Sequence, residues 1–192
     1  MEPSDEELCW RVANRDEAAF DRLVERYQQR AYRLAWSIVR DAEEARHLSQ
    51  EAFIRLFEGA ASFAGRARFS TWFYRILVNL CLDHRRRHRW WRQVLSLVSP
   101  TNGSEPSIIE QAPAPLQDPV EDIGRVQDMR ELWAAVDRLS PRQRAAVLLH
   151  VQEELPTAEI AAVLDCSETT VRVHLHRALT TLRKTIGSAA RA

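Results

Sequence analysis

The sequence lacks any long apolar run, contains a single lysine and has only three cysteines among its 192 residues. No segment approaches the roughly 18 consecutive apolar residues that a membrane span requires. The acidic start of the chain, residues 1–8, has no apolar signal-peptide core. Cys9, Cys81 and Cys166 are far apart, which argues against a disulfide framework and a standard zinc motif. We therefore expect a cytoplasmic protein without structural disulfides.

Motifs that carry catalysis are missing as well. The sequence contains no nucleophile elbow, no glycine-rich phosphate loop and no clustered pair of carboxylates. We therefore expect a protein that is not an enzyme, with no catalytic residue, no cofactor and no small-molecule substrate.

One possible metal site has to be weighed against a simpler interpretation. Cys81, His84 and His88 recur at spacings of three and four, so one helix face could present a thiolate and two imidazoles to a metal ion. The interpretation we prefer is a buried cysteine beside two solvated or DNA-facing histidines, because the neighbouring arginines would repel a cation. No metal is expected.

Strand-like alternation of apolar and polar residues is also absent, and the apolar periodicity is helical throughout. The first stripe, at spacings of three and four, comprises Phe20, Leu23, Val24, Tyr27, Ala31, Leu34, Ala35 and Ile38. Asp41 and Glu44 form a capping-box pattern that opens a second helix. Residues 59–68 are expected to form a loop, after which Ser70 or Thr71 caps a third, long helix. We expect Trp72 and Phe73, on the apolar side of this helix, to lie in the core of the protein and not to face DNA.

A change of composition divides the chain. Five prolines lie between residues 96 and 119, with several serines, a glycine and an asparagine, a composition typical of a flexible linker. Helical pattern resumes near Asp122. The sequence thus predicts an all-α protein of two small helical domains, 1–95 and 128–192, joined by an acidic, proline-rich linker, 96–127.

Charge is unevenly distributed, although the net charge is zero. Between residues 59 and 92, eight arginines face one aspartate, and the five basic residues after Glu168 face no acid. The segments 2–58 and 93–128 are acidic. Two basic segments separated by an acidic one predict two points of contact with a polyanion.

The second basic segment forms the second helix of a helix-turn-helix pattern. A short helix, 156–164, precedes a turn at Asp165 and a longer helix that Ser167 can cap. Asp tolerates the left-handed conformation of such a turn. The predicted interface consists of Ile160, Val163, Leu164, Val171, Leu175 and Leu179. The second helix would enter the major groove by its N-terminal end, whereas the alternative is a structural hairpin with a solvated outer face.

The first basic segment continues the third helix into residues 83–92, which combine arginines with Trp90 and Trp91. Arginines attract phosphates, and aromatic rings offer stacking platforms for unpaired bases. This combination suits a protein that holds single-stranded DNA, although the arginine run by itself is equally consistent with solvated charge.

Together these motifs resemble the sigma-70 family of transcription initiation factors. Residues 41–53 are similar to the segment that docks on the polymerase clamp helices, and residues 63–79 to the loop and helix that read and open the minus-10 element. Residues 139–144 and the helix-turn-helix that ends in residues 170–178 are similar to the domain that reads the minus-35 element. The middle domain of the family is missing between these two regions, which points to the compact extracytoplasmic-function (ECF) group.

The resemblance implies partners and site residues. Core RNA polymerase is expected to contact Asp41, Glu44, Leu48, Gln50, Glu51 and Phe53. The minus-10 element, including a base flipped from the non-template strand, is expected to contact Phe63, Ala64, Arg66, Arg68, Arg75, Asn79, Arg85 and Arg86. The minus-35 duplex is expected to contact Ser167, Thr169, Thr170, Arg172, Val173, His174, His176 and Arg177. The family also implies an anti-sigma factor as a partner.

A regulator that binds duplex DNA without polymerase, through the helix-turn-helix alone, is the main alternative. It leaves the clamp-like helix and the basic aromatic helix without a role.

Overall fold

The computed structural model describes residues 2–98 and 133–189 of the chain, and side chains within 2–90 and 133–184. The helices are α1 (Asp5–Ala13), α2 (Glu17–Val39), α3 (Ala42–Gly59), the 3-10 turn η1 (Ala60–Ser62), α4 (Phe69–Val98), α6 (Pro141–Val151), α7 (Thr157–Leu164) and α8 (Glu168–Ala189). Residues 133–137 are also helical. The described residues contain no strand, so the all-α prediction is confirmed. The predicted linker lies outside the described residues except for 96–98, which end α4.

The first helix, α1, was not predicted from the sequence. The Ser4 side chain accepts a hydrogen bond from the Glu7 amide at 3.1 Å, and three acids occupy the first turn, where the helix dipole favours negative charge. Leu8, Cys9 and Val12 are fully buried. The acidic start of the chain is therefore a capped helix that closes one end of the core.

Helices α2 and α3 follow the predicted apolar stripes. In α3, Asp41 Oδ1 accepts from the Glu44 amide at 2.9 Å, which is the first half of the predicted capping box. The Glu44 carboxylate lies 3.4 Å from Nδ1 of His84 on α4. The Glu44 side chain thus connects α3 to α4.

The long helix α4 begins earlier than predicted. The Phe69 amide donates to Oε1 of Glu6 at 3.0 Å, so an acid from α1 caps the helix and the predicted caps Ser70 and Thr71 fall inside its first turn. This prediction was wrong because the capping group is 63 residues away in the sequence. Phe73 is fully buried as expected, while Trp72 is only partly buried.

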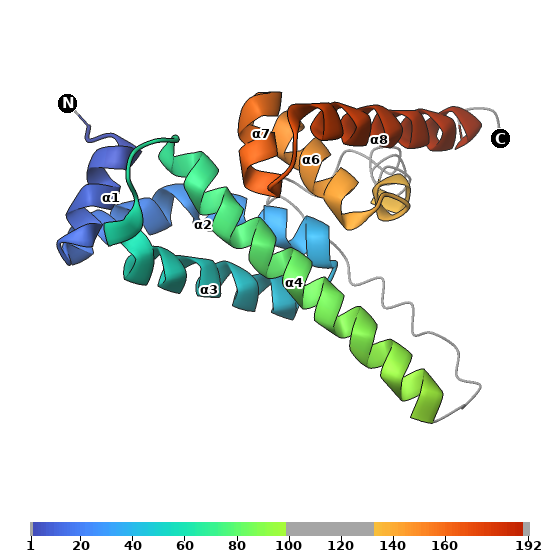
Figure 1. The fold of residues 1–192 in the computed structure, drawn as a ribbon, viewed down its shortest axis with the longest axis horizontal. Coiled ribbons are helices and arrows are strands. Elements are labelled where there is room, and N and C mark those ends of the chain that lie inside the picture. The colour runs from blue at the N-terminus through green and yellow to red at the C-terminus, as the bar shows by residue number, and fades with distance from the viewer. Residues whose placement is uncertain (1, 99–132, 190–192) are drawn as a thin grey trace, which may run out of the picture.

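The C-terminal helices pack on α2 and on the first half of α4, as Figure 1 shows, and the end of α4 projects from the body. Buried apolar residues of both halves form one continuous core. Ser140 caps α6 with Pro141 in the first turn and a complete capping box to Gln143. No helix in the described part of the chain is long and apolar enough to cross a membrane.

A buried arginine joins the two halves. Arg144 on α6 is only 3% exposed, and its Nη1 donates to the carbonyl oxygen of Ser37 at 3.0 Å near the C-terminus of α2. Its Nη2 donates to the carbonyls of Asp137 and Leu139. A cation is favourable where a helix leaves carbonyls unpaired. Burial lowers the pKa of Arg144 to about 10, against the opposing effect of Asp137.

Candidate nucleic-acid and polymerase-binding surfaces

The turn between α7 and α8 has the geometry of a helix-turn-helix. Asp165 adopts the left-handed conformation, with φ 51° and ψ 57°, and its amide donates to Ala161. Ser167 Oγ accepts from the Thr170 amide at 3.1 Å and so caps α8. The turn and cap residues therefore lie as the sequence predicts.

Four of the six predicted interface residues of the motif are buried, and Leu175 is partly buried against the core. Ile160, Val163, Leu164 and Val171 are almost fully inaccessible. Leu179 is 46% exposed, so its prediction as an interface residue was wrong. Ala178 is buried in its place, because it lies seven residues after Val171 and stays on the same face of α8.

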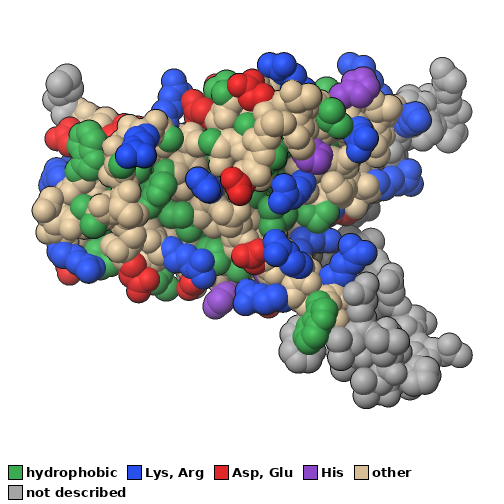
Figure 2. Space-filling model, viewed as in Figure 1, with side chains coloured by type: hydrophobic (Ala, Val, Ile, Leu, Met, Phe, Trp, Pro, Cys, Tyr) green, Lys and Arg blue, Asp and Glu red, His purple; other side chains and the backbone are tan. Residues whose placement is uncertain are grey.

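The first turns of α8 present most of the expected DNA-contacting side chains to solvent. The exposed residues are Ser167, Thr169, Arg172, Val173, His176 and Arg177. Arg172 is held by Glu168, one turn earlier, at 3.2 Å, an exposed pair that a DNA phosphate or base can replace. Figure 2 shows basic side chains gathered over the outer part of α8 and along the projecting part of α4.

His174 differs from its neighbours on α8. Its side chain is partly buried. Its Nδ1 atom is inaccessible to solvent and has no hydrogen-bond partner among the described residues. Burial lowers the pKa of His174, and the positive charges of Arg142 and Arg177 lower it further. His174 therefore faces the body of the motif more than the exposed side of the helix.

The loop before α4 is built around a buried phenylalanine. Phe63, expected to contact the minus-10 element, is 6% exposed and packs against Trp72 with ring centroids 5.4 Å apart. Gly65 adopts φ 65°, and Ala64 and Arg66 are exposed. In this structure Phe63 supports the loop, while its neighbours form the accessible surface.

The face of α4 that follows the loop carries the other expected minus-10 residues. Asn79 is exposed. Nε of Arg68 lies 3.5 Å from a carboxylate oxygen of Glu159, and Nη2 of Arg75 lies 3.9 Å from Asp165. The structure thus brings these residues together on one face and also brings acids of the C-terminal half to them.

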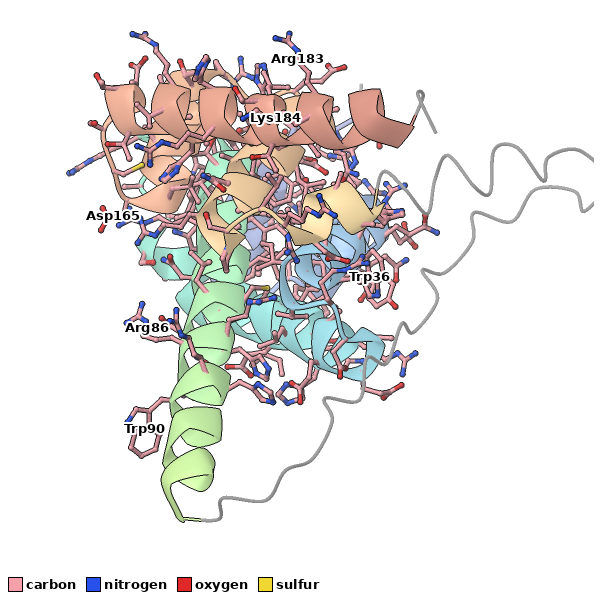
Figure 3. All side chains as sticks on the ribbon, turned by 90° about the vertical axis from the view of Figure 1, so that its right-hand side faces the viewer. Trp36, Arg86, Trp90, Asp165, Arg183 and Lys184 are labelled. Atoms are coloured by element: carbon pink, nitrogen blue, oxygen red, sulfur yellow. The ribbon has the colours of Figure 1, made fainter. Side chains whose placement is uncertain are left out.

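The projecting part of α4 carries the basic aromatic segment. Arg85 donates to the Ile38 carbonyl at 2.8 Å and so contacts the end of α2. Arg86 lies 3.1 Å from Asp83 and is largely exposed. Figure 3 shows Arg86 and the exposed Trp90 pointing to the same side of α4, where a stacked base and its phosphate could be held together.

The segment of α3 that resembles a polymerase-docking segment exposes fewer of its expected contact residues than the sequence suggests. Leu48 and Phe53 are buried and contribute to the core. Asp41 and Gln50 are exposed, and Glu51 pairs with Arg55 at 2.9 Å.

Sequence reasoning missed Ile54, which is 52% exposed on the same helix. Its position off the apolar stripe, four residues after Gln50, was the available signal. An exposed isoleucine among polar residues suits a protein interface.

Cys81, His84 and His88, which were weighed as possible metal ligands, form no such site: within the described residues, no cluster of three His, Cys, Asp or Glu side chains could hold an ion. Cys81 is fully buried, and burial raises its pKa to about 12, which disfavours the thiolate that a metal needs. The rings of His84 and His88 stack at 6.1 Å.

Comparisons with known proteins agree with this geometry. The models of Sigma-70 region 2 and Sigma-70, region 4 match residues 23–91 and 129–182. The ECF RNA polymerase sigma factor SigE of Mycolicibacterium smegmatis is 35% identical over 95% of this chain and 69% of its own length. SigM of Mycobacterium tuberculosis is 33% identical over 97% of this chain and 86% of its own. The chain belongs to the ECF group of the sigma-70 family.

Solved structures share the fold. CnrH, in complex with the cytosolic domain of CnrY, superposes with a TM-score of 0.68 at 19% identity, covering 97% of this chain and 99% of CnrH. RpoE of Bartonella quintana, in complex with the anti-sigma factor NepR, gives a TM-score of 0.65 at 18% identity, covering 88% and 96% of the two chains.

Proposed function

We propose that this chain is a transcription initiation factor that binds core RNA polymerase, directs it to specific promoters and assists DNA melting. The observation that carries the proposal is the presence, in one sigma-family chain, of two separate basic surfaces that are suited to binding DNA. One is the exposed start of α8, and the other is the basic face of α4 with its loop. A duplex reader and a single-strand reader together suit a protein that first locates a promoter and then opens it.

The division of labour follows the two halves. Residues 1–95 dock on polymerase through the exposed part of α3 and hold the minus-10 element, and residues 128–192 read the minus-35 element. Residues 96–127 connect them. Capturing a flipped base offsets an unstacking cost of a few kcal/mol, and contacts made only to that base supply specificity. Polymerase performs the chemistry in the cytoplasm, so the chain needs no catalytic residue or cofactor.

An anti-sigma factor is the proposed regulatory partner. The solved structures of CnrH and RpoE each contain such a fold bound to a second protein, CnrY or NepR. On this chain, exposed apolar side chains such as Trp10 and Ile54 offer contact sites for a partner.

Run-off transcription tests the proposal. Core RNA polymerase is supplied with genomic fragments, including the DNA upstream of the chain's own gene, with and without the protein. Discrete new start sites that require the protein are expected, and their upstream sequences give both promoter elements. Absence of transcripts, together with no co-elution with core polymerase, would favour a regulator that binds duplex DNA alone.

A further inference from the structure

An exposed tryptophan on α1 lies against the loop that precedes α4. Trp10 is 51% exposed, whereas most tryptophans in folded proteins bury the greater part of their surface. A Cβ added at Gly65 would lie 3.4 Å from Cζ2 of Trp10, so part of the indole covers this glycine. Figure 1 shows the loop between η1 and α4 passing beside α1. The remainder of the ring is open to solvent at the edge of the loop.

The same helix also holds the end of the loop where α4 begins. Oε1 of Glu6 accepts a hydrogen bond from the Phe69 amide at 3.0 Å. Asp5, in the same turn of α1, accepts a hydrogen bond from the hydroxyl of Tyr27 on α2 at 2.6 Å. These contacts tie α1 to α2 and to α4, and they engage two acids of its first turn inside the protein. Trp10 is therefore held in a defined position beside the loop.

The loop next to Trp10 is basic and closely approachable. Arg66 and Arg68 are exposed, and Arg68 keeps 73% of its side chain accessible although it lies 3.5 Å from Glu159. Ala64 and Gly65 are exposed as well and have little side chain to keep a ligand away from the backbone. Arginines that attract phosphates beside an aromatic face that stacks on bases are the two components of a single-strand site. The charge thus favours a polyanion over an apolar protein surface at Trp10.

We propose that the indole of Trp10 stacks on an unpaired base of the non-template strand, next to the base that the loop captures. The inference deepens the proposed function and rests on it, because it takes the loop as part of the minus-10 surface. The sequence predicted no DNA contact for any residue of α1. Every base has a π face, so stacking on Trp10 adds affinity and fixes the path of the strand without selecting one base.

The first test compares substitutions of Trp10 in the full chain bound to core RNA polymerase. The probe is a fluorescein-labelled single-stranded oligonucleotide with the non-template minus-10 region of a promoter mapped by run-off transcription. Anisotropy should show that Trp10→Ala binds it about fivefold to twentyfold more weakly than the wild type. Trp10→Phe keeps an aromatic face and should bind within about threefold of the wild type. Trp10→Leu, apolar without a π face, should behave like Trp10→Ala.

The matched control is Val151→Ala, which removes an exposed apolar side chain at the end of α6. It should bind the oligonucleotide like the wild type. Equal affinity of Trp10→Ala and the wild type overturns the proposal. Wild-type affinity of Trp10→Leu overturns it too, because an apolar contact would then suffice and stacking would play no part.

Abasic substitutions in the oligonucleotide locate the stacked base. Each nucleotide in turn is replaced by a stable abasic analogue, and binding is measured with the wild type and with Trp10→Ala. At one position the two changes should not add, because each removes the same stacking contact, and at the others they should add. Additive losses at every position contradict the inference, since Trp10 would then act on binding by another route.

The inference and the proposed function fail in different ways. If the wild type co-elutes with core polymerase and drives transcription while the Trp10 variants bind the oligonucleotide normally, only the stacking role is lost. If Trp10→Ala no longer co-elutes with core polymerase, Trp10 contacts polymerase and the inference is overturned. If the wild type itself neither co-elutes nor drives transcription, the proposed function fails first, and the inference falls with it.

Discussion

The guanidinium of Arg144 donates to the carbonyl oxygen of Ser37, 3.0 Å away and 107 residues earlier in the chain. The same side chain also donates to Asp137 and Leu139, so it satisfies carbonyls on both sides of the junction between the two halves. A buried charge is stable only with such partners. Arg144 is therefore a polar contact between the two halves that acts beside the Arg40–Asp137 ion pair and the shared apolar core.

Arg144→Ala is expected to lower the free energy of unfolding by about 2–3 kcal/mol, because it leaves buried carbonyls without donors. Thermal denaturation followed by circular dichroism measures the change and should show a broader transition, since the halves become less coupled. Arg183→Ala, at an exposed position of α8, is the control and should unfold like the wild type. A wild-type midpoint for Arg144→Ala would show that the junction adds no stability.

The left-handed turn at Asp165 predicts an order among substitutions. Asp165→Asn and Asp165→Gly should be tolerated, whereas Asp165→Ala should lower the free energy of unfolding by about 1 kcal/mol, because alanine keeps the Cβ that is strained at φ 51° and lacks the short polar side chain that lets Asp and Asn adopt this conformation. Urea titration resolves this difference. If alanine proved as stable as glycine, backbone strain would not govern the turn.

The exposed arginines of α8 should contribute to duplex recognition. Arg172→Ala and Arg177→Ala should each weaken binding to a minus-35 duplex by roughly 1–3 kcal/mol if they read bases. An electrophoretic mobility shift assay at fixed salt measures the affinity for the duplex. Arg22→Ala on α2 is the matched control. Affinities indistinguishable from that of the wild type would remove these residues from the reading surface.

Asn79 should act after polymerase has bound. Asn79→Ala is expected to slow promoter opening while leaving the affinity for core polymerase unchanged, because we propose that the exposed amide of Asn79 contacts an unpaired base. Permanganate footprinting of unpaired thymines follows opening, and co-elution with core polymerase provides the control. Opening at the wild-type rate would exclude Asn79 from the capture surface.

His174 should make the protein less stable in acid. Its pKa in the folded protein lies below the ordinary value of 6.5, so the unfolded chain binds the proton more readily. The stability contributed by the neutral ring is present above pH 6.5 and is lost as the pH falls through the lower native pKa. His174→Gln should therefore lose less stability than the wild type between neutral and mildly acidic pH, measured by urea titration. Identical losses would contradict the assignment.

Caps and turns that depend on neighbouring residues were predictable from the sequence. Features that depend on contacts between distant segments were not. The caps at Asp41 and Ser140 and the turn at Asp165 depend on neighbours within a few residues, and the sequence identified all three. The start of α4 was misplaced because its cap, Glu6, comes from another helix. Leu48 and Phe53 were expected to contact polymerase, yet both are buried in the core of this chain. Apolar residues on the stripe of an amphipathic helix usually pack against the core.

The contact between Trp36 and Trp133 has a practical consequence. Their rings lie 4.9 Å apart at 88°, and the guanidinium of Arg40 sits over both, at 3.9 and 5.0 Å from the ring centroids. Indoles this close couple their electronic transitions, and a nearby cation shifts their emission. Trp36 belongs to one half of the chain and Trp133 to the other. A separation of the two halves would therefore change the ultraviolet spectrum of the two indoles, which can be measured without any attached dye.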